Sequence, residues 1–165
     1  MNNNLFKLRI KALLIDYLCI CVYLIMLFIG VMIFYLKGIP QFSEFKSHVI
    51  SFVSTVLPIT LFYSLKEGVA PFASFGKAKM GLYLQYKQKP LFNSFLRNFY
   101  KFLPWQLGHI AVINGMYNDF NSGIFYITYA LAIVLPIIYI MMAYLRRDHC
   151  HLPDLLVNAN LNKVL

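Results

Sequence analysis

The sequence LRIKALLIDY, residues 8–17, opens a long apolar run and places a carboxylate inside it. An ionised Asp within hydrocarbon costs about 2.5–3.5 kcal/mol on insertion scales, so it usually faces protein or water rather than lipid. Arg9 and Asp16 are seven residues apart, on nearly the same helix face and about 10 Å from each other along the axis. Because that separation is too long for a direct ion pair, we expect each side chain to find its partner elsewhere in the fold.

The composition is that of an integral membrane protein. Of 165 residues, 60% are hydrophobic, and the mean hydropathy is +0.64, whereas a soluble domain averages about 45–50% apolar residues. The formal net charge is +9, but the basic residues flank the apolar blocks instead of forming one aromatic-studded patch. This distribution indicates membrane topology, with the lipid bilayer as the partner, and argues against nucleic-acid binding.

Four apolar blocks predict an all-α membrane protein with a four-helix transmembrane bundle as its single domain. The third block is the weakest, since it contains Gln106, His109 and Asn114, and it spans only if preceding residues contribute or if it is re-entrant. Pro58, inside the second block, requires neighbouring groups to satisfy the carbonyl that it frees. The expected spans are 10–36, 49–65, 98–116 and 124–145, with a cytoplasmic loop over 66–97.

The loop 66–97 contains two local patterns. Apolar residues and a tyrosine recur at every second position from Met80 to Tyr86, which predicts a short strand-like segment. After Pro90, which can open a helix, Phe and Leu side chains recur at helical spacing from Leu91 to Phe102. Basic residues lie at positions 97 and 101, so this pattern predicts an interfacial amphipathic helix leading into the third span.

The distribution of lysine and arginine orients the bundle. With four spans, thirteen of the fifteen basic residues fall on one side, and Lys37 and Lys46 fall on the other. Three spans would instead place the N-terminal and C-terminal basic clusters on opposite faces. We therefore expect a multi-pass protein of the cytoplasmic membrane with both termini in the cytoplasm.

Three sequence blocks stand out together. They are LRIKALLID at 8–16; a loop block with Glu67, SFGKAKMGL at 74–82 and LRNFYKFLP at 96–104; and RRDHCHLPDLL at 146–156.

In this order and spacing the blocks resemble the RDD family of small membrane proteins. That family is named for an Arg and an Asp at the first helix and an Asp after the last helix, which match Arg9, Asp16 and Asp154 here. The family's Gly-Lys-x-x-x-Gly-Leu loop element matches Gly76, Lys77, Gly81 and Leu82. The residues that we take as functional candidates are Arg9, Asp16, Glu67, Gly76, Lys77, Arg97, His109 and Asp154.

The resemblance implies transport, including cation/proton exchange. A membrane carboxylate with a shifted pKa can alternate between a proton and a metal ion. Asp16 is the only acid inside a confident span, so a homo-oligomer or a membrane-protein partner would be needed to supply more acids. His109 is a candidate proton relay, although an interhelical hydrogen bond is the simpler interpretation.

Two other functions compete with transport. One is a non-enzymatic accessory or scaffold protein whose basic loop and tail engage lipid or a partner, and the other is an immunity or resistance protein acting inside the membrane. The first is distinguished from transport by geometry. Acids and His109 that converge on a water-filled cavity indicate transport, whereas acids locked in pairs with Arg and Lys indicate a scaffold.

The sequence predicts no enzyme, no cofactor and no metal centre. No Ser-His or Cys-His pair has the spacing of a nucleophile and its base. His149, Cys150 and His151 are adjacent, so their side chains point apart in regular structure, and the sequence has no second cluster of metal-binding residues.

Two contacts are expected from the topology. Arg9 and Asp154 should meet at the cytoplasmic interface as a strong Arg–carboxylate pair. Asp16 should face the bundle interior and contact Arg97, Lys101, Arg146 or a polar group of the third span.

Overall fold

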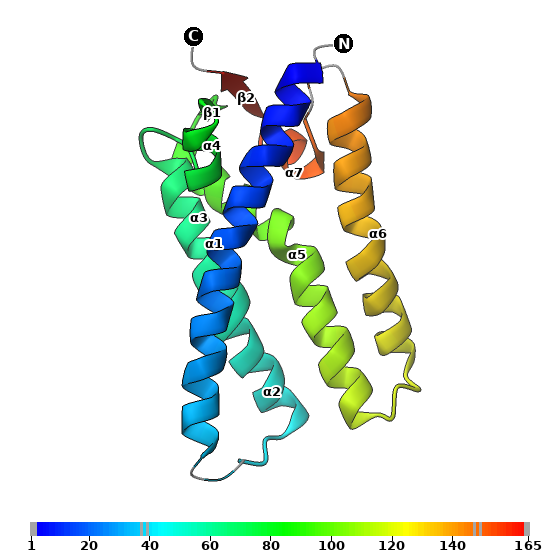
Figure 1. Cartoon of the computed structure of the whole chain (residues 1–165). Coiled ribbons are helices and arrows are strands. Elements are labelled where there is room, and N and C mark those ends of the chain that lie inside the picture. Colours follow the sequence, from blue (N-terminus) through cyan, green and yellow to red (C-terminus); the bar gives the residue numbers. More distant parts are fainter. Residues whose placement is uncertain (1–2, 37, 39, 147, 149, 164–165) are drawn as a thin grey trace.

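The computed structural model describes residues 3–36, 38, 40–146, 148 and 150–163 and is mostly helical (Figure 1). Its helices and strands, in chain order, are α1 (Asn3–Tyr35), α2 (Glu44–Ser51), a π-helical turn (Phe52–Val56), α3 (Leu57–Gly68), α4 (Phe75–Lys79), β1 (Leu82–Tyr86), α5 (Pro90–Tyr117), α6 (Gly123–Leu145), α7 (Leu152–Leu156) and β2 (Ala159–Lys163).

Within the described residues, three helical segments are long and apolar enough to cross a membrane, namely Leu5–Tyr35, Glu44–Gly68 and Gly123–Leu145. The second is longer than the expected 49–65, since Ser43 caps it and accepts a hydrogen bond from the Lys46 backbone N–H. By length and composition the structure therefore supports three of the four expected spans. The third expected span, 98–116, lies within α5, which does not reach the same apolar composition.

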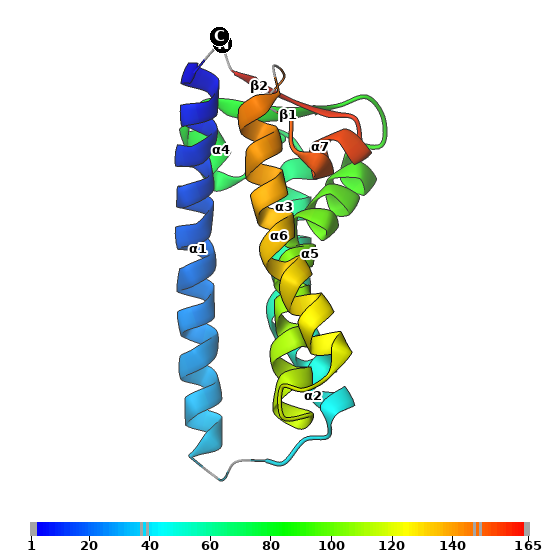
Figure 2. The same ribbon diagram turned by 90° about the vertical axis from the view of Figure 1, so that its right-hand side faces the viewer.

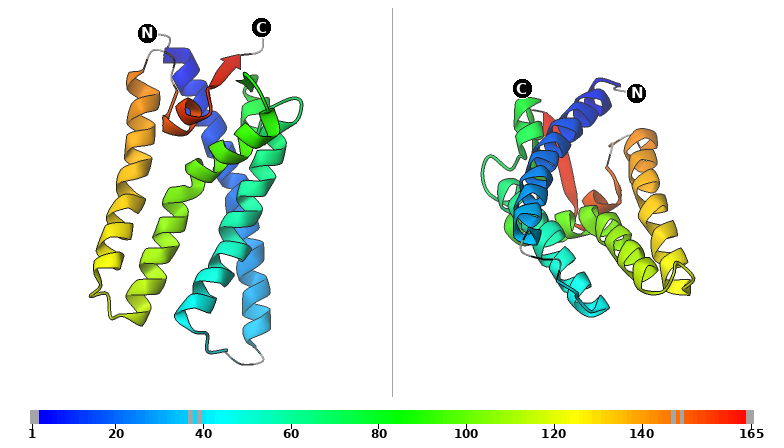
Figure 3. Two further views of the ribbon diagram at one scale, coloured as in Figure 1. Left: turned by 180° about the vertical axis from the view of Figure 1, so that it is seen from behind. Right: turned by 60° about the horizontal axis from the view of Figure 1, so that its bottom comes forward.

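The predicted interfacial helix and the predicted third span form one continuous helix, α5, of 28 residues. At the far end of the bundle, Asn114 Nδ2 donates to Glu44 Oε1 at 2.9 Å, and the hydroxyls of Tyr117 and Ser47 are 3.0 Å apart. The views in Figures 1 and 3 show α5 running beside α6. The start of α1 and the strand β2 lie at the opposite end of the bundle (Figures 1 and 2).

A tyrosine of α1 bonds a carbonyl that Pro58 leaves without a partner. Pro58 lies in Glu44–Gly68, the continuous segment of α2, the π-helical turn and α3, which we call the second helical run. Proline lacks an N–H, so the carbonyl four residues earlier, that of Ser54, has no partner within its own helix. Tyr23 Oη donates to this oxygen at 2.6 Å. The expected help therefore comes from a neighbouring helix, and the bond joins α1 to the second helical run. The nearby hydroxyls of Ser54 and Thr55, which were also expected to help, bond the carbonyls of Ile50 and Ser51 instead.

A second hydrogen bond from a tyrosine hydroxyl to a carbonyl freed by a proline joins α5 to α6. Pro104 lies inside α5 and frees the carbonyl of Tyr100. Tyr139 Oη of α6 donates to that oxygen at 3.1 Å. Figure 3 shows α5 changing direction along its length, as expected for a helix with an internal proline.

The strand-like segment 80–86 is confirmed as β1, but its partner strand was not predicted. β1 pairs antiparallel with β2 of the C-terminal tail, with Leu82 opposite Lys163. Fully burying a leucine side chain contributes about 1.5–3 kcal/mol, so the leucines of this sheet fix it to the first turns of α1. The buried residues of this cluster are Ala12, Leu82, Leu84 and Leu161.

Candidate functional site

Most of the charged motif residues gather at the end of the bundle where the chain termini lie. Five of them form a continuous series of buried ion pairs, which we call the ion-pair network: Arg9, Asp154, Arg97, Glu67 and Lys77. Charges removed from water this completely are tolerated only when they are paired and hydrogen-bonded.

Asp154 lies in α7 and is 1% exposed. Its Oδ1 accepts a hydrogen bond from Arg97 Nε at 2.6 Å, and its Oδ2 accepts one from Arg9 Nη2. The predicted pairing of Arg9 with Asp154 is therefore confirmed. His151 and Asp154 cap the start of α7 reciprocally, with Pro153 in its first turn, and both features favour a helix start at this point.

Glu67, at the end of α3, is bonded through both carboxylate oxygens. Its Oε2 accepts from Arg97 Nη1 at 2.6 Å and from Asn98 Nδ2 at 3.0 Å, while Oε1 accepts from Lys77 Nζ. Arg97 thus bridges Glu67 and Asp154 through two edges of its planar guanidinium. A lysine, with one compact ammonium group, does not reproduce this bridge.

Asp16 faces into the protein and is 3% exposed. Ser74 Oγ donates to its Oδ2 at 2.6 Å, and the Gly76 backbone N–H donates to its Oδ1 at 2.8 Å. Both donors lie at the start of α4, where backbone N–H groups lack partners within the helix. The expected interior orientation is confirmed, but the expected partner is wrong, because the contact is with the loop between α3 and α5 rather than with the third expected span.

The cations expected near Asp16 have other neighbours. Arg97 is shared between Glu67 and Asp154, and Arg146 pairs with Asp148 at the surface. Lys101 Nζ lies over aromatic rings instead of against a carboxylate.

Gly76 allows the loop to reach Asp16. A Cβ atom at this position would lie 2.8 Å from the Ala12 carbonyl carbon and 3.0 Å from Asp16 Oδ1, and would also collide with the Ala12 carbonyl oxygen. Only glycine lets the α4 backbone approach α1 this closely. Lys77, the next residue, reaches Glu67, so the Gly-Lys pair docks the loop on α1 and joins it to the ion-pair network.

The electrostatics of the loop and tail follow from burial and pairing. Burial alone would raise the pKa of Asp154, but Arg97 and Arg9 hold it well below its ordinary value. Burial lowers the pKa of Lys77, and the Glu67 carboxylate opposes that shift. Burial also lowers the pKa of His151 well below its ordinary value, which leaves a neutral imidazole near pH 7.

His109 does not join these acids. Its Nε2 lies 3.1 Å from Thr55 Oγ1, and its ring stacks on Trp105 with centroids 6.1 Å apart. This is the interhelical hydrogen bond that was the simpler interpretation, and it lies between the second helical run and α5.

Three residues that complete the site were not among the functional candidates taken from the sequence. Ser74 stands three residues before Lys77 and His151 three residues before Asp154, and each caps a helix. Asn98 bonds both Glu67 and the Ser94 carbonyl. The spacing of a capping residue before the Gly-Lys and Pro-Asp pairs is the signal that points to the first two.

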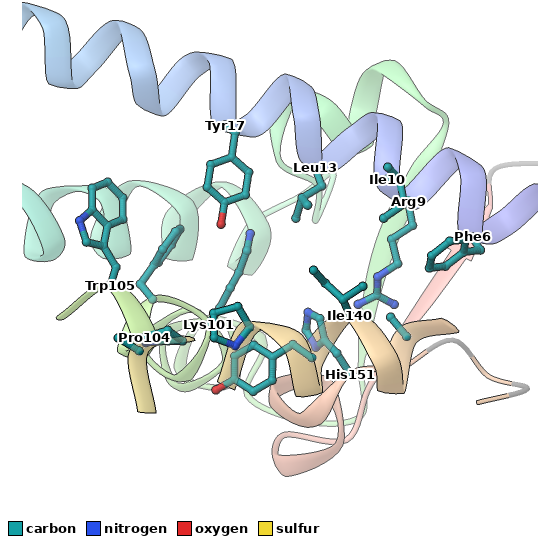
Figure 4. Close-up of a pocket in the computed structure, with 15 residues that line it drawn as sticks. Phe6, Arg9, Ile10, Leu13, Tyr17, Lys101, Pro104, Trp105, Ile140 and His151 are labelled. Atoms are coloured by element: carbon teal, nitrogen blue, oxygen red, sulfur yellow. The ribbon is translucent and has the colours of Figure 1, made fainter. Parts of the chain in front are cut away.

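A cavity of about 320 Å³ lies beside the ion-pair network, between α1, α5, α6 and α7 (Figure 4). Its walls are mostly apolar side chains such as Leu13, Trp105 and Ile140. The basic side chains on its wall are Arg9, Lys101 and His151. Asp16, Glu67 and Asp154 do not line this cavity.

No group of three or more His, Cys, Asp or Glu residues that could hold a metal ion occurs in the part of the chain that the structure describes. His149, one member of the His-Cys-His sequence, lies outside that part.

Comparison with known proteins identifies a family. The model of the RDD family matches residues 5–158, and this range contains every motif residue described above. No curated protein and no solved structure matches significantly. Since the match covers nearly the whole chain, and its apolar helices are long enough to cross a bilayer, this protein belongs to the RDD family of membrane proteins.

Proposed function

We propose that the chain is a non-enzymatic accessory or scaffold protein of the cytoplasmic membrane. In this role the ion-pair network holds the loop after α3 and the tail after α6 as one rigid platform on the membrane helices. The observation that carries the proposal is that Asp16, Glu67 and Asp154 are each bonded through both carboxylate oxygens. Fully bonded polar networks rigidify a structure and specify one packing.

The network joins parts of the chain that are far apart in sequence. Arg9 lies on α1, Glu67 on α3, Lys77 on α4, Arg97 on α5 and Asp154 on α7. A platform built this way offers its exposed basic loop to lipid headgroups or to a membrane-protein partner. The same platform also gives a homo-oligomer a fixed surface for assembly.

Four membrane crossings with both termini in the cytoplasm fit this platform. α5 has 28 residues, a length of about 42 Å at 1.5 Å per residue, and it connects the network end to the far end beside α2. If α5 crosses, thirteen of the fifteen basic residues lie at the network end. Two of the fifteen, Lys37 and Arg147, lie outside the described residues and are placed by sequence alone.

Transport by carboxylate exchange has less support. Such exchange needs an acid that faces a cavity, and none of the three buried acids at this end, Asp16, Glu67 and Asp154, lines the cavity beside the network. Releasing Glu67 or Asp154 would leave a buried cation unpaired at a cost of roughly 3–5 kcal/mol. Counting about 20 residues back from Tyr35 for one crossing places Asp16 at the membrane interface rather than at the midplane.

Reconstituted vesicles test the two functions together. One readout is proton flux driven by a cation gradient, followed with a pH-sensitive dye inside the vesicles, and the other is protease cleavage of the tail after α6. We expect no flux above that of empty vesicles and a protected tail in the wild type. Glu67→Gln leaves Arg97 and Lys77 facing a neutral amide, so it should expose the tail to cleavage.

Glu44→Gln is the matched control, because it makes the same change at the far end and should leave the tail protected. The scaffold proposal fails if the wild type carries a cation-dependent proton flux that Asp16→Asn abolishes while the tail stays protected.

A further inference from the structure

We infer that the cavity between α1, α5, α6 and α7 binds an anionic membrane lipid, whose headgroup phosphate sits at Lys101 and whose chains follow the apolar wall. This inference requires the chain to lie in a membrane, but it depends on neither the orientation nor the scaffold role proposed above.

Lys101 provides the charge argument. Its ammonium group has no hydrogen-bonded or ion-paired partner among the residues that the structure describes. It lies over the rings of Tyr63 and Phe102, 5.2 Å from each centroid, and ring faces compensate a cation only in part. A partly buried ammonium in this setting is completed by an anion.

The neighbouring acids do not supply that anion. Glu67 is already shared by Lys77, Arg97 and Asn98. Asp16 is held by the loop through Ser74 and Gly76. Among the described side chains that face the interior of the network end, Lys101 is therefore a cation that these acids do not pair, and it lies on the cavity wall.

The geometry of the cavity adds a second polar group. In Figure 4 the Lys101 side chain extends from α5 toward α1, where the hydroxyl of Tyr17 points into the same space. The Tyr17 hydroxyl has no hydrogen-bond partner in the described parts of the chain. An ammonium and a free hydroxyl facing one space form a donor pair for phosphate oxygens.

The rest of the cavity selects for an amphiphile rather than a bare ion. Leu13, Pro136 and Ile140 line it, so a ligand must present apolar surface beside its charge. Tyr17 is 49% exposed and Ile140 is 53% exposed, so the walls formed by α1 and α6 continue onto the surface that faces lipid. A bilayer lipid can enter from that side with its chains remaining in the bilayer.

Native mass spectrometry of the purified full-length protein in detergent tests the inference. The probes are phosphatidylglycerol and phosphatidylcholine with identical acyl chains, which differ in net headgroup charge. We expect one phosphatidylglycerol to bind roughly tenfold or more tightly than phosphatidylcholine, as for one charge-assisted hydrogen bond in a desolvated site. Lys101→Met should abolish this preference.

Lys66→Met is the matched control. Lys66 also lies over an aromatic ring, 4.9 Å from the Phe75 centroid, but it does not line the cavity. The control should keep the full preference. Equal binding of the two lipids by the wild type, or an unchanged preference in Lys101→Met, overturns the inference.

Two further arms keep the test decisive. Leu13→Trp keeps the Lys101 charge but fills the cavity, so it should weaken phosphatidylglycerol binding about tenfold even if Lys101→Met fails to fold; unchanged binding would overturn the inference. Glycerol phosphate, which has the headgroup chemistry without chains, should not displace the lipid. Displacement at equal concentration would assign the site to a soluble phosphate and overturn the lipid assignment.

Discussion

The two ends of the bundle are held by different interactions. At the network end, Arg97, Glu67 and Asp154 are at most 1% exposed although all three are charged. Toward the far end, Met26 and Ile33 of α1 are 69% and 62% exposed although both are apolar. In water this distribution would be inverted, but lipid chains are as apolar as Met and Ile, so these residues gain little by packing against protein.

The difference shows how each half contributes to the fold. The exposed apolar surface places the helices in a bilayer, but it does not decide which helices meet. The buried charges decide which helices meet, because each buried acid has hydrogen bonds to both of its oxygens only when particular donors from other elements reach it. We therefore expect substitutions at the network end to affect stability far more than substitutions of similar size in the apolar half.

The largest expected effect is that of Arg97→Met. This substitution keeps most of the side-chain volume but removes the bridge between Glu67 and Asp154, and both carboxylates are then left with fewer partners in a buried site. The free energy of unfolding should fall by roughly 3–5 kcal/mol or more, seen as a large loss of folded protein in a detergent thermal-shift assay.

Arg146→Met is the control for Arg97→Met. Arg146 pairs with Asp148, but both side chains are more than 40% exposed, so water replaces the lost contact. No measurable change in the unfolding midpoint is expected. Equal losses for the two variants would refute the distinction between buried and exposed charges.

Gly76→Ala should have the next largest effect. The added methyl group meets the Ala12 carbonyl, a backbone group that cannot rotate away. The loss in unfolding free energy should lie near the upper end of roughly 1–3 kcal/mol, the usual cost of overpacking.

Gly30→Ala in the apolar half sharpens the comparison. A Cβ atom there meets nothing within 4 Å, and alanine favours a helix over glycine by about 1 kcal/mol. The same chemical change should therefore destabilise at residue 76 and leave stability equal or higher at residue 30. A loss at both positions would show that helix packing in the apolar half is tighter than its exposure indicates.

Acidification should lower the stability of the network end, because the unfolded chain binds a proton at His151 more readily than the folded chain does. Burial holds its pKa well below the ordinary 6.5, so the unfolded chain binds a proton that the folded chain does not. Stability is therefore present above pH 6.5 and declines below it, by up to about 2 kcal/mol at pH 5. Asp154 adds nothing in this window, because its lowered pKa costs stability only below its ordinary value of 3.8.

His151→Asn isolates this contribution. Asparagine is a strong N-cap residue and does not titrate, so this variant should lose less stability than the wild type between pH 7 and pH 5 in thermal unfolding. Parallel pH profiles for the two proteins would contradict a buried neutral His151.

The sequence predicts the elements that depend on local pattern. The apolar blocks of α1 and α6, the alternation in β1 and the pairing of Arg9 with Asp154 all follow from composition, period or position along the chain. The sequence also predicts that Asp16 faces inward, because an ionised carboxylate is costly in lipid.

The partner of Asp16 could not be predicted in the same way. Its donors are the Ser74 hydroxyl and a backbone N–H of Gly76, and hydropathy and charge patterns do not register backbone donors. β2 was missed for a related reason. ANLNK at 159–163 alternates apolar and polar residues, but the alternation is short and rich in asparagine, which is depleted in strands, so this segment depends on pairing with β1. Both cases depend on how the loop folds back onto α1, which is a long-range property.

The smallest predicted effects lie in the tyrosine hydroxyls that bond proline-freed carbonyls. Tyr23→Phe removes the hydrogen-bond donor to the Ser54 carbonyl, and Tyr139→Phe removes the donor to the Tyr100 carbonyl. Interhelical hydrogen bonds within membranes contribute about 0.6 kcal/mol on average and at most about 1.7 kcal/mol, so each variant should lower the unfolding free energy by about that average.

Tyr126→Phe is the control for both tyrosine variants, because the described residues give the Tyr126 hydroxyl no hydrogen-bond partner and its side chain is 58% exposed. The double variant should lose the sum of the two single losses, since one bond joins α1 to the second helical run and the other joins α5 to α6. A single tyrosine variant that destabilises as much as Arg97→Met would contradict the comparison. The hydrogen bonds outside the ion-pair network would then decide helix pairing as strongly as the buried charges do.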